Sequence, residues 1–141
     1  MLGNGNVGKT SLLDYYASKG KSEHVDHPGD DFCYLDYVSD CGDECRLKIW
    51  HAKGMQNSVD STMGFCKNVD GFIIVFDLTK RESFSDVSNW LDGIGQHKDL
   101  STCPFILIGT RLDLCNSDNP NGGDQRQVPR GLAETFAFLN E

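Results

Sequence analysis

Apolar and polar positions along this chain predict strands and helices in alternation. The apolar runs Phe72–Phe76 and Phe105–Ile108 are typical of strands that are buried on both faces of a parallel sheet. Helical spacing of apolar residues predicts two amphipathic helices, the first with Phe84, Val87, Leu91 and Ile94 and the second with Leu132, Phe136 and Leu139. The alternation indicates an α/β fold with a mostly parallel sheet and helices on both faces.

The first half of the chain adds a helix and a hairpin. Ser11–Ala17 carries an apolar stripe and predicts a helix, and the polar stretch Ser18–Asp31 after it is expected to be a loop. Phe32–Val38 and Arg46–Trp50 are strand-like and are separated by a short turn-like segment, which predicts an antiparallel hairpin. Gly54–Asn68 is ambiguous between loop and helix.

Two features punctuate the second half. Thr79-Lys80-Arg81-Glu82 has the form of a capping box and is expected to open the helix that contains Phe84. The stretch Asn116–Asp124 is rich in Gly, Asn and Asp and predicts a loop.

Composition narrows the class of protein. A chain of 141 residues predicts one domain over residues 1–141, and its net charge of −8 argues against nucleic-acid binding and against a basic membrane patch. No apolar run has the length of a membrane span, and the start lacks a signal-peptide pattern. The six cysteines form no C-x-x-C pair, so we expect reduced thiols in a cytoplasmic domain rather than a zinc site.

A phosphate-binding pattern lies at the start of the chain. The segment Gly3-Asn4-Gly5-Asn6-Val7-Gly8-Lys9-Thr10, followed by Ser11, matches G-x-x-x-x-G-K-[ST] at every fixed position. Its glycines allow backbone N–H groups to curl around phosphate oxygens, Lys9 reaches the β- and γ-phosphates, and the Thr10 hydroxyl ligates Mg²⁺. A helix that starts near Gly8 would point its positive end at the same anion. The alternative is a glycine-rich turn that matches by chance.

The strand that should lead into this loop is short. Only Met1 and Leu2 precede Gly3, whereas a strand usually has about five or six residues. We therefore expect most of the first strand to be absent from this sequence.

A second motif, Gly109-Thr110-Arg111-Leu112-Asp113, follows the apolar run that ends at Ile108. Ligands bind at the carboxyl ends of strands in doubly wound sheets, so this motif is expected to face the same crevice as the phosphate loop. The Asp113 carboxylate can accept hydrogen bonds from the N1–H and the exocyclic amine of guanine, a donor pair that adenine lacks. A turn-capping aspartate is the alternative interpretation.

With these motifs the chain resembles the Ras superfamily of small GTPases, most closely the Rab-like branch. The resemblance rests on the phosphate loop, the base-recognition motif, and the segments Leu47–Trp50, Asp70–Thr79, Glu82–Phe84 and Asn89–Leu91. It implies a Rossmann-like P-loop NTPase fold, bound GTP or GDP with Mg²⁺, and base contacts from Thr110, Arg111 and Asp113.

The family's catalytic motif is altered. That motif is Asp-x-x-Gly-Gln, in which the Asp holds Mg²⁺ through water, the Gly amide contacts the γ-phosphate and the Gln orients the attacking water. Here His51 replaces the Asp and Met55 replaces the Gln, while Gly54 is kept. Imidazole is a poor partner for Mg²⁺, and a thioether cannot orient water as an amide does. Gly54 and the displaced Gln56 remain weak catalytic candidates.

The first switch and the far end of the chain also depart from the family. His27 stands where the family has a Mg²⁺-binding Thr, and Asp30 or Asp31 could supply an oxygen instead or be solvated loop charges. The family's last strand with its base-backing loop, its last helix and its prenylated cysteines would follow Glu141. We therefore expect a fragment of a longer protein, a partial G domain without a membrane anchor.

Three functional hypotheses follow. The first is a Rab-like guanine-nucleotide switch of vesicle trafficking or signalling, with weak GTP hydrolysis and with effector or regulator proteins bound through its switch regions. The second is a catalytically inactive module that binds proteins and either keeps its nucleotide or has none. An adenine-specific P-loop enzyme fits less well, because Asp113 matches guanine.

Overall fold

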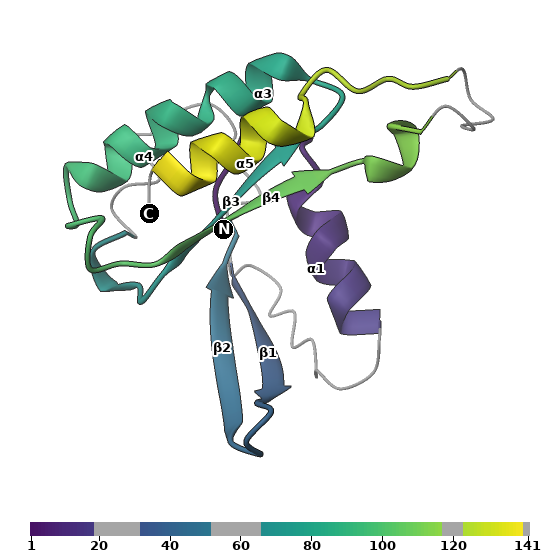
Figure 1. Ribbon diagram of the computed structural model, residues 1–141. Helices are drawn as coiled ribbons and strands as arrows, with labels where there is room; N and C mark the ends of the chain where they lie inside the picture. Colours follow the sequence, from purple (N-terminus) through teal and green to yellow (C-terminus); the bar gives the residue numbers. More distant parts are fainter. Residues whose placement is uncertain (19–31, 52–65, 117–122, 140–141) are drawn as a thin grey trace.

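The computed structural model describes residues 1–18, 32–51, 66–116 and 123–139 (Figure 1). The α/β fold is confirmed: a parallel pair of strands, β3 (Phe72–Asp77) and β4 (Phe105–Thr110), lies at the centre. Figure 1 shows α1 (Lys9–Ser18) on one side of this pair and the remaining labelled helices on the other. These are α3 (Arg81–Ser85), α4 (Val87–Gly95) and α5 (Arg130–Leu139).

The core is built around β3. Ile74, Val75 and Phe76 are buried, as the continuous apolar run predicted for a central strand. The ring of Phe84 in α3 lies 5.1 Å from that of Phe76 and 5.5 Å from that of Phe136 in α5, measured between centroids. This line of rings attaches two helices to the sheet, because aromatic pairs at such distances are attractive beyond their buried area.

The predicted hairpin is confirmed. Its strands are β1 (Phe32–Val38) and β2 (Glu44–Trp50), which pair antiparallel with Phe32 opposite Trp50. β2 begins two residues before the predicted Arg46, because Glu44 and Cys45 still pair with Val38 and Tyr37. Gly42 adopts a φ of +89° in the turn, a conformation that glycine tolerates and that few other residues adopt.

The described strands form two separate sheets, the hairpin and the parallel pair. Among the described residues, β2 pairs with β1, whereas β3 pairs with β4 and with Leu2 alone. The Leu2 amide donates to the Ile73 carbonyl (2.7 Å), and the Val75 amide donates to the Leu2 carbonyl (2.9 Å). The Met1 amino group donates to the Trp50 carbonyl (2.5 Å) at the end of β2. These two residues therefore form the contact between the two sheets at this point.

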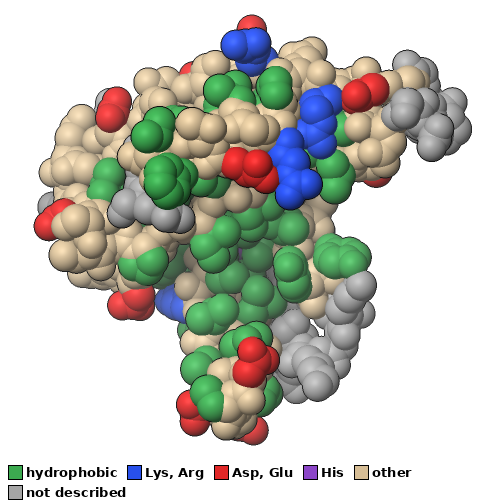
Figure 2. Space-filling model, in the orientation of Figure 1, with side chains coloured by type: hydrophobic (Ala, Val, Ile, Leu, Met, Phe, Trp, Pro, Cys, Tyr) green, Lys and Arg blue, Asp and Glu red, His purple; other side chains and the backbone are tan. Residues whose placement is uncertain are grey.

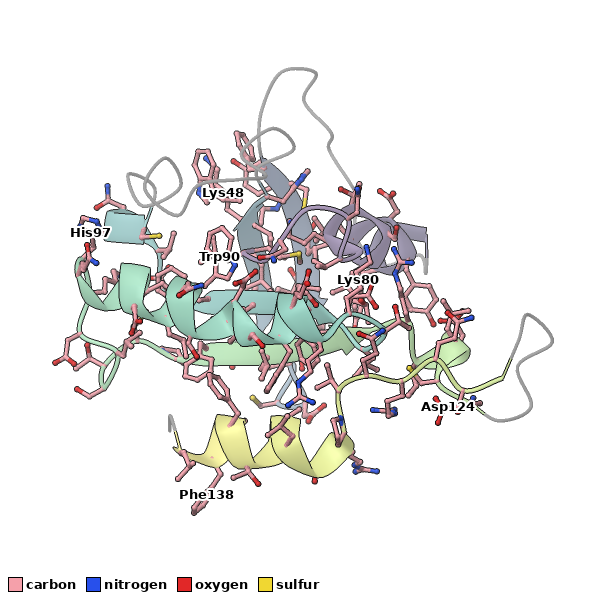
Figure 3. The ribbon with its side chains drawn as sticks, turned by 90° about the horizontal axis from the view of Figure 1, so that it is seen from above. Lys48, Lys80, Trp90, His97, Asp124 and Phe138 are labelled. Carbon is pink, nitrogen blue, oxygen red and sulfur yellow. The ribbon has the colours of Figure 1, made fainter. Side chains whose placement is uncertain are left out.

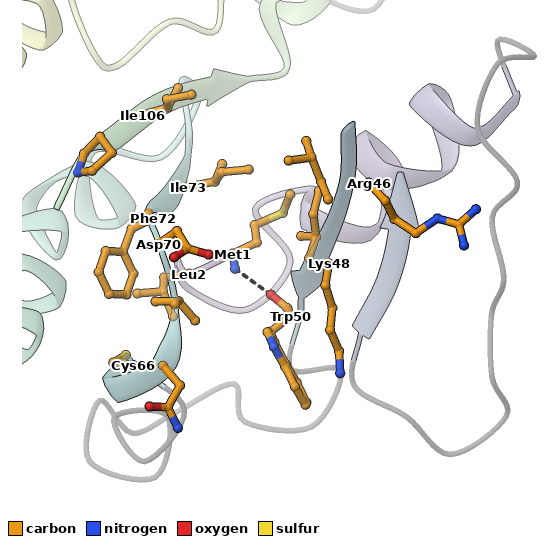
Figure 4. A pocket seen from close by; sticks show the side chains of 16 residues that line it. Met1, Leu2, Arg46, Lys48, Trp50, Cys66, Asp70, Phe72, Ile73 and Ile106 are labelled. Atoms are coloured by element: carbon orange, nitrogen blue, oxygen red, sulfur yellow. Dashed lines mark hydrogen bonds between the residues drawn. The ribbon is translucent and has the colours of Figure 1, made fainter. Parts of the chain in front are cut away.

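A groove of about 560 Å³ lies between β2 and β3 (Figure 4). It is lined by both strands, by Met1 and Leu2, and by residues near the start of β4. Figure 2 shows apolar side chains over the hairpin and beside the parallel strands, and Leu47 and Ile106 are 49% and 60% exposed. No residue of the predicted nucleotide motifs lines this groove, so it is separate from the candidate site.

The start of α3 differs from the prediction. The capping-box prediction was wrong: the residue before the helix is Lys80, and it makes no side-chain capping bond. The Thr79 hydroxyl instead donates to Oδ1 of Asp77 (2.6 Å), because the buried carboxylate requires donors more than the helix end does. The apolar spacing then continues through two helices that are joined at Asp86.

Substitution of Gly3 tests how closely the start of the loop packs against β3. Its φ is +130°, and a Cβ there would lie 2.1 Å from the Val75 carbonyl oxygen. Because β3 cannot retreat without losing its pairing, we expect Gly3→Ala to lower the free energy of unfolding by about 3 kcal/mol or more. Gly42→Ala is the matched control, since its φ of +89° is also positive but no atom lies within 4 Å, and it should cost about 1–2 kcal/mol. Urea denaturation measures both; equal losses would contradict the steric argument.

Candidate nucleotide-binding site

The predicted phosphate loop connects Leu2 to α1. The chain takes positive φ values at Gly3 (+130°), Asn6 (+59°) and Gly8 (+95°), and these curl the backbone. The first intrahelical bond runs from the Leu12 amide to the Gly8 carbonyl (3.0 Å). By helix geometry the amides of residues 9–11 therefore have no acceptor inside α1, and their dipoles favour an anion at this end.

Lys9 lies against the same loop. Its Nζ donates to the carbonyl oxygens of Gly3 (2.7 Å) and Asn4 (2.6 Å). Burial lowers the pKa of Lys9 from its ordinary value. The ammonium is thus bonded to two carbonyls of the loop that the sequence predicts to bind phosphate.

Asn4 attaches the loop to α4. Its Nδ2 donates to Oδ2 of Asp86 (2.6 Å), and its Oδ1 accepts a bond from Nε1 of Trp90 (3.2 Å). Figure 3 shows Trp90 projecting from α4 away from α5. Sequence reasoning named Asn4 only as a variable position of the loop and missed this anchor, because its partners lie more than 80 residues away.

The second motif lies directly beside the loop. The Thr110 hydroxyl, at the end of β4, is 2.6 Å from the Val7 carbonyl oxygen and 3.0 Å from that of Phe76, and it can donate to either. Nη2 of Arg111 donates to the Asn6 carbonyl (3.0 Å). Residues separated by more than 100 positions in sequence therefore meet at one end of the parallel strands, as parallel topology requires.

Asp113 lies in η2 (Leu112–Leu114), a short 3₁₀ turn that follows β4. The side chain of Asp113 is exposed. The turn is closed by the Leu114 amide, which donates to the Arg111 carbonyl (3.1 Å), and the thiol of buried Cys115 lies 3.3 Å from the same oxygen. The carboxylate is thus carried by a short, internally bonded turn that is connected to the phosphate loop through Arg111.

Some of the other predicted site residues lie within the described ranges and some lie outside them. Gly54, Met55 and Gln56 lie outside the described residues, as do the first-switch positions His27, Asp30 and Asp31. His51 is described and is buried immediately after β2. Gly5, Thr10 and Ser11 lie where the sequence predicted, in the loop and the first turn of α1, and the side chains of Thr10 and Ser11 are exposed.

The donors present suit a phosphate group better than a free metal ion. The curled amides and Lys9 offer hydrogen-bond donors in one place, the arrangement that phosphate-binding loops use. No group of three or more His, Cys, Asp or Glu side chains within the described ranges could hold a metal. The Thr10 hydroxyl alone could supply one oxygen ligand, so Mg²⁺ would need phosphate oxygens and water for the others.

The model of the Ras family matches residues 1–140. The chain belongs to the Ras family. Within that family it is similar to Rab proteins, a relation that agrees with the Rab-like resemblance of its motifs.

Three Rab relatives illustrate the similarity. Ras-related protein Rab-27A of Canis lupus familiaris is 31% identical, in an alignment that covers 97% of this chain and 65% of the relative. Ras-related protein rab-39 of Caenorhabditis elegans is 31% identical, with 97% and 58% covered. Ras-related protein Rab-12 of Homo sapiens is 30% identical, with 97% and 52% covered. This Ras-family chain thus spans between about half and two thirds of the length of these relatives.

No helix in the described part of this Ras-family chain combines the length and the apolar character that crossing a bilayer requires. All six cysteines, which lie in the described part, are free thiols in this structure.

The Asn4 anchor supplies the second test. Asn4→Ala leaves the indole N–H of Trp90, a residue only 6% exposed, without its acceptor, and it removes the Asn4 donor from Oδ2 of Asp86. We expect a loss of about 1–3 kcal/mol in the free energy of unfolding, because a buried polar group then has no partner. Urea denaturation followed by tryptophan fluorescence measures the loss.

Asn89→Ala is the matched control for this prediction. Asn89 is exposed and donates to Oδ1 of the same Asp86 carboxylate (3.1 Å), so its removal should cost less than about 0.5 kcal/mol. If the two variants lose equal stability, the anchor has no special role.

Proposed function

We propose that the chain is part of the G domain of a Rab-like small GTPase, which binds guanine nucleotide and acts in the cytoplasm as a switch of vesicle trafficking or signalling. The observation that carries this proposal is the direct bonding of Thr110 and Arg111 to the carbonyls of Val7 and Asn6. These contacts bring the predicted phosphate loop and the motif that contains Asp113 to one end of the sheet, which supports the proposal. Membership of the Ras family supports the same function.

The residue roles follow from the chemistry of the groups. The amides of Gly3–Thr10 and Ser11 would hold the phosphates, with Lys9 as the cation. The Thr10 hydroxyl would contribute one oxygen to Mg²⁺, which neutralises phosphate charge when it is bound. Thr110 and Arg111 would shape the base site, and Asp113 would accept the two guanine N–H bonds.

Turnover is proposed to be weak. In the family an Asp before the conserved Gly serves the metal, and a Gln after it orients water. The chain has His51 and Met55 at these positions, and His51 is buried. Gly54 keeps the family position and could contact the γ-phosphate. Gln56 stands one position late, so it could orient water only if the register shifted. Fast hydrolysis would therefore need an arginine supplied by a regulator.

A catalytically inactive interaction module is the second candidate. The burial of an imidazole at the catalytic position favours it, because this group serves Mg²⁺ poorly. The hairpin also presents a cationic and aromatic surface to a partner: Nζ of Lys48 lies 3.9 Å from the ring centroid of Phe32 and 4.4 Å from that of Trp50. Effectors or regulators could bind there in either candidate.

The test begins with the purified protein. We expect denaturation to release about one equivalent of GDP or GTP, and added GTP to be hydrolysed slowly or only with a regulator present. GTP that remains intact for days favours the interaction module. Released adenine nucleotide, or an empty site that does not fill with added GDP, would refute the proposed function.

Lys9→Ala tests the phosphate contact. Removing an ammonium that binds a charged oxygen costs about 1.5–3 kcal/mol per bond, so GDP binding should weaken by at least about tenfold and occupancy after purification should vanish. Lys80→Ala, at an exposed lysine just before α3, is the control and should leave GDP affinity unchanged. Calorimetry with GDP measures both variants; unchanged affinity in Lys9→Ala would refute the assigned contact.

A further inference from the structure

Asp77 is the one carboxylate that is buried in the described part of the chain, with an exposed fraction of 0%. It is the last residue of β3, and it lies opposite Thr110 in the register of the parallel pair. A buried charge of this kind is costly unless it is paired and hydrogen-bonded. The groups that bond to Asp77 therefore indicate which part of the structure the buried charge stabilises.

The two carboxylate oxygens of Asp77 have different partners. Oδ1 accepts bonds from the Thr79 amide (2.8 Å) and from the Thr79 hydroxyl (2.6 Å). Oδ2 lies 3.0 Å from Nε of Arg111, which forms an ion pair with it. The first oxygen thus fixes the carboxylate locally, and the second connects it to the base-recognition motif.

The Arg111 guanidinium contacts two different groups. While Nε faces Asp77, Nη2 donates to the Asn6 carbonyl in the phosphate loop (3.0 Å). The Arg111 backbone has a φ of +62° and that of Asn6 a φ of +59°, left-handed conformations that residues other than glycine rarely adopt. Two unfavourable backbone conformations are therefore joined by one side chain that is anchored to a buried charge.

We propose that Asp77 is a positioning residue for nucleotide binding. Through Arg111 it holds the Asn6 carbonyl, and with it the curled form of the phosphate loop, in register with the turn that carries Asp113. This inference rests on the proposed function and deepens it, because it adds a residue outside the nucleotide motifs to the same site. The planar fork of arginine suits this role, since the single nitrogen of a lysine cannot make both contacts with the same geometry.

The experiment is a double-mutant cycle with Asp77→Asn, Arg111→Met and the double variant. The first readout is hydrogen exchange of the backbone amides in the nucleotide-free protein, and the second is the GDP dissociation constant. We expect each single variant to speed exchange at residues 3–9 and 110–115, and to weaken GDP binding by about tenfold, with the double variant no worse than either. Arg111→Lys should lie between the wild-type protein and Arg111→Met.

The chain offers a matched control for this cycle. Asp36 and Arg46 form an exposed ion pair in the hairpin, with Nε 2.7 Å from Oδ1. Asp36→Asn and Arg46→Met remove a similar pair that has no contact with the phosphate loop. They should change neither GDP affinity nor amide exchange at residues 3–9.

The outcomes separate the inference from the proposed function. Additive effects in the cycle, or faster exchange spread evenly over β3 and α4 as well as the loop, would overturn the positioning role. If Asp77→Asn does not fold, Arg111→Met decides the matter, because the Arg111 side chain is 41% exposed and its replacement changes no apolar side chain of the core, although it leaves the Asp77 carboxylate without its ion-pair partner. Wild-type protein that binds no GDP refutes the proposed function, while the exchange measurement still decides the positioning of the loop.

Discussion

The parallel pairing of β3 with β4 is the constraint on which the candidate site depends. Its register places Asp77 opposite Thr110, so that the residues after both strands leave the sheet at the same end. Leu2 joins the same sheet through its bridge to Ile74, and the phosphate loop that follows therefore also starts at this end. Because parallel strands all point one way, segments far apart in sequence meet here.

Apolar packing positions the strands and helices, whereas polar contacts orient the loops at the strand ends. Apolar burial on β3 and the line of rings through Phe84 attach α3 and α5 to the sheet, and this determines where the strands lie. The loops at the strand ends are then held by hydrogen bonds and by an ion pair, which are directional and so specify orientation. The phosphate loop is held by such bonds on two sides: its Asn4 donates to Asp86 of α4, and Thr110 of β4 donates to its Val7 carbonyl.

The departures from the Ras-family pattern concern turnover more than binding. The predicted phosphate loop keeps every fixed position of its pattern and lies beside the turn that carries Asp113, in a motif with Thr110 where the family more often has Asn. His51 stands where the family has an Asp that holds Mg²⁺ through water. The hairpin lies in a sheet of its own, so its cationic and aromatic surface is separate from the bonds that hold the loop. The proposed nucleotide site and the proposed partner surface thus lie in different parts of the fold.

The sequence by itself determined the elements that depend on local chemistry. Uninterrupted apolar runs predicted where β3 and β4 lie, but the prediction that β4 is buried on both faces was wrong, because its Ile106 is 60% exposed. Helical spacing predicted the apolar faces of α4 and α5, and the glycine pattern predicted a curled loop before α1. These signals are local, because burial period and backbone freedom are properties of a few neighbouring residues. The two motifs of the candidate site were found in the same way.

Only the tertiary structure decided which side chains hold these motifs together. The contact of Asn4 with Trp90, and that of Arg111 with Asp77 and Asn6, join positions that no short pattern relates. The capping prediction at Thr79 failed for the same reason, because a buried carboxylate two residues earlier took the hydroxyl. A polar side chain bonds to whichever group is left unpaired beside it, and that group is known only once the chain has folded.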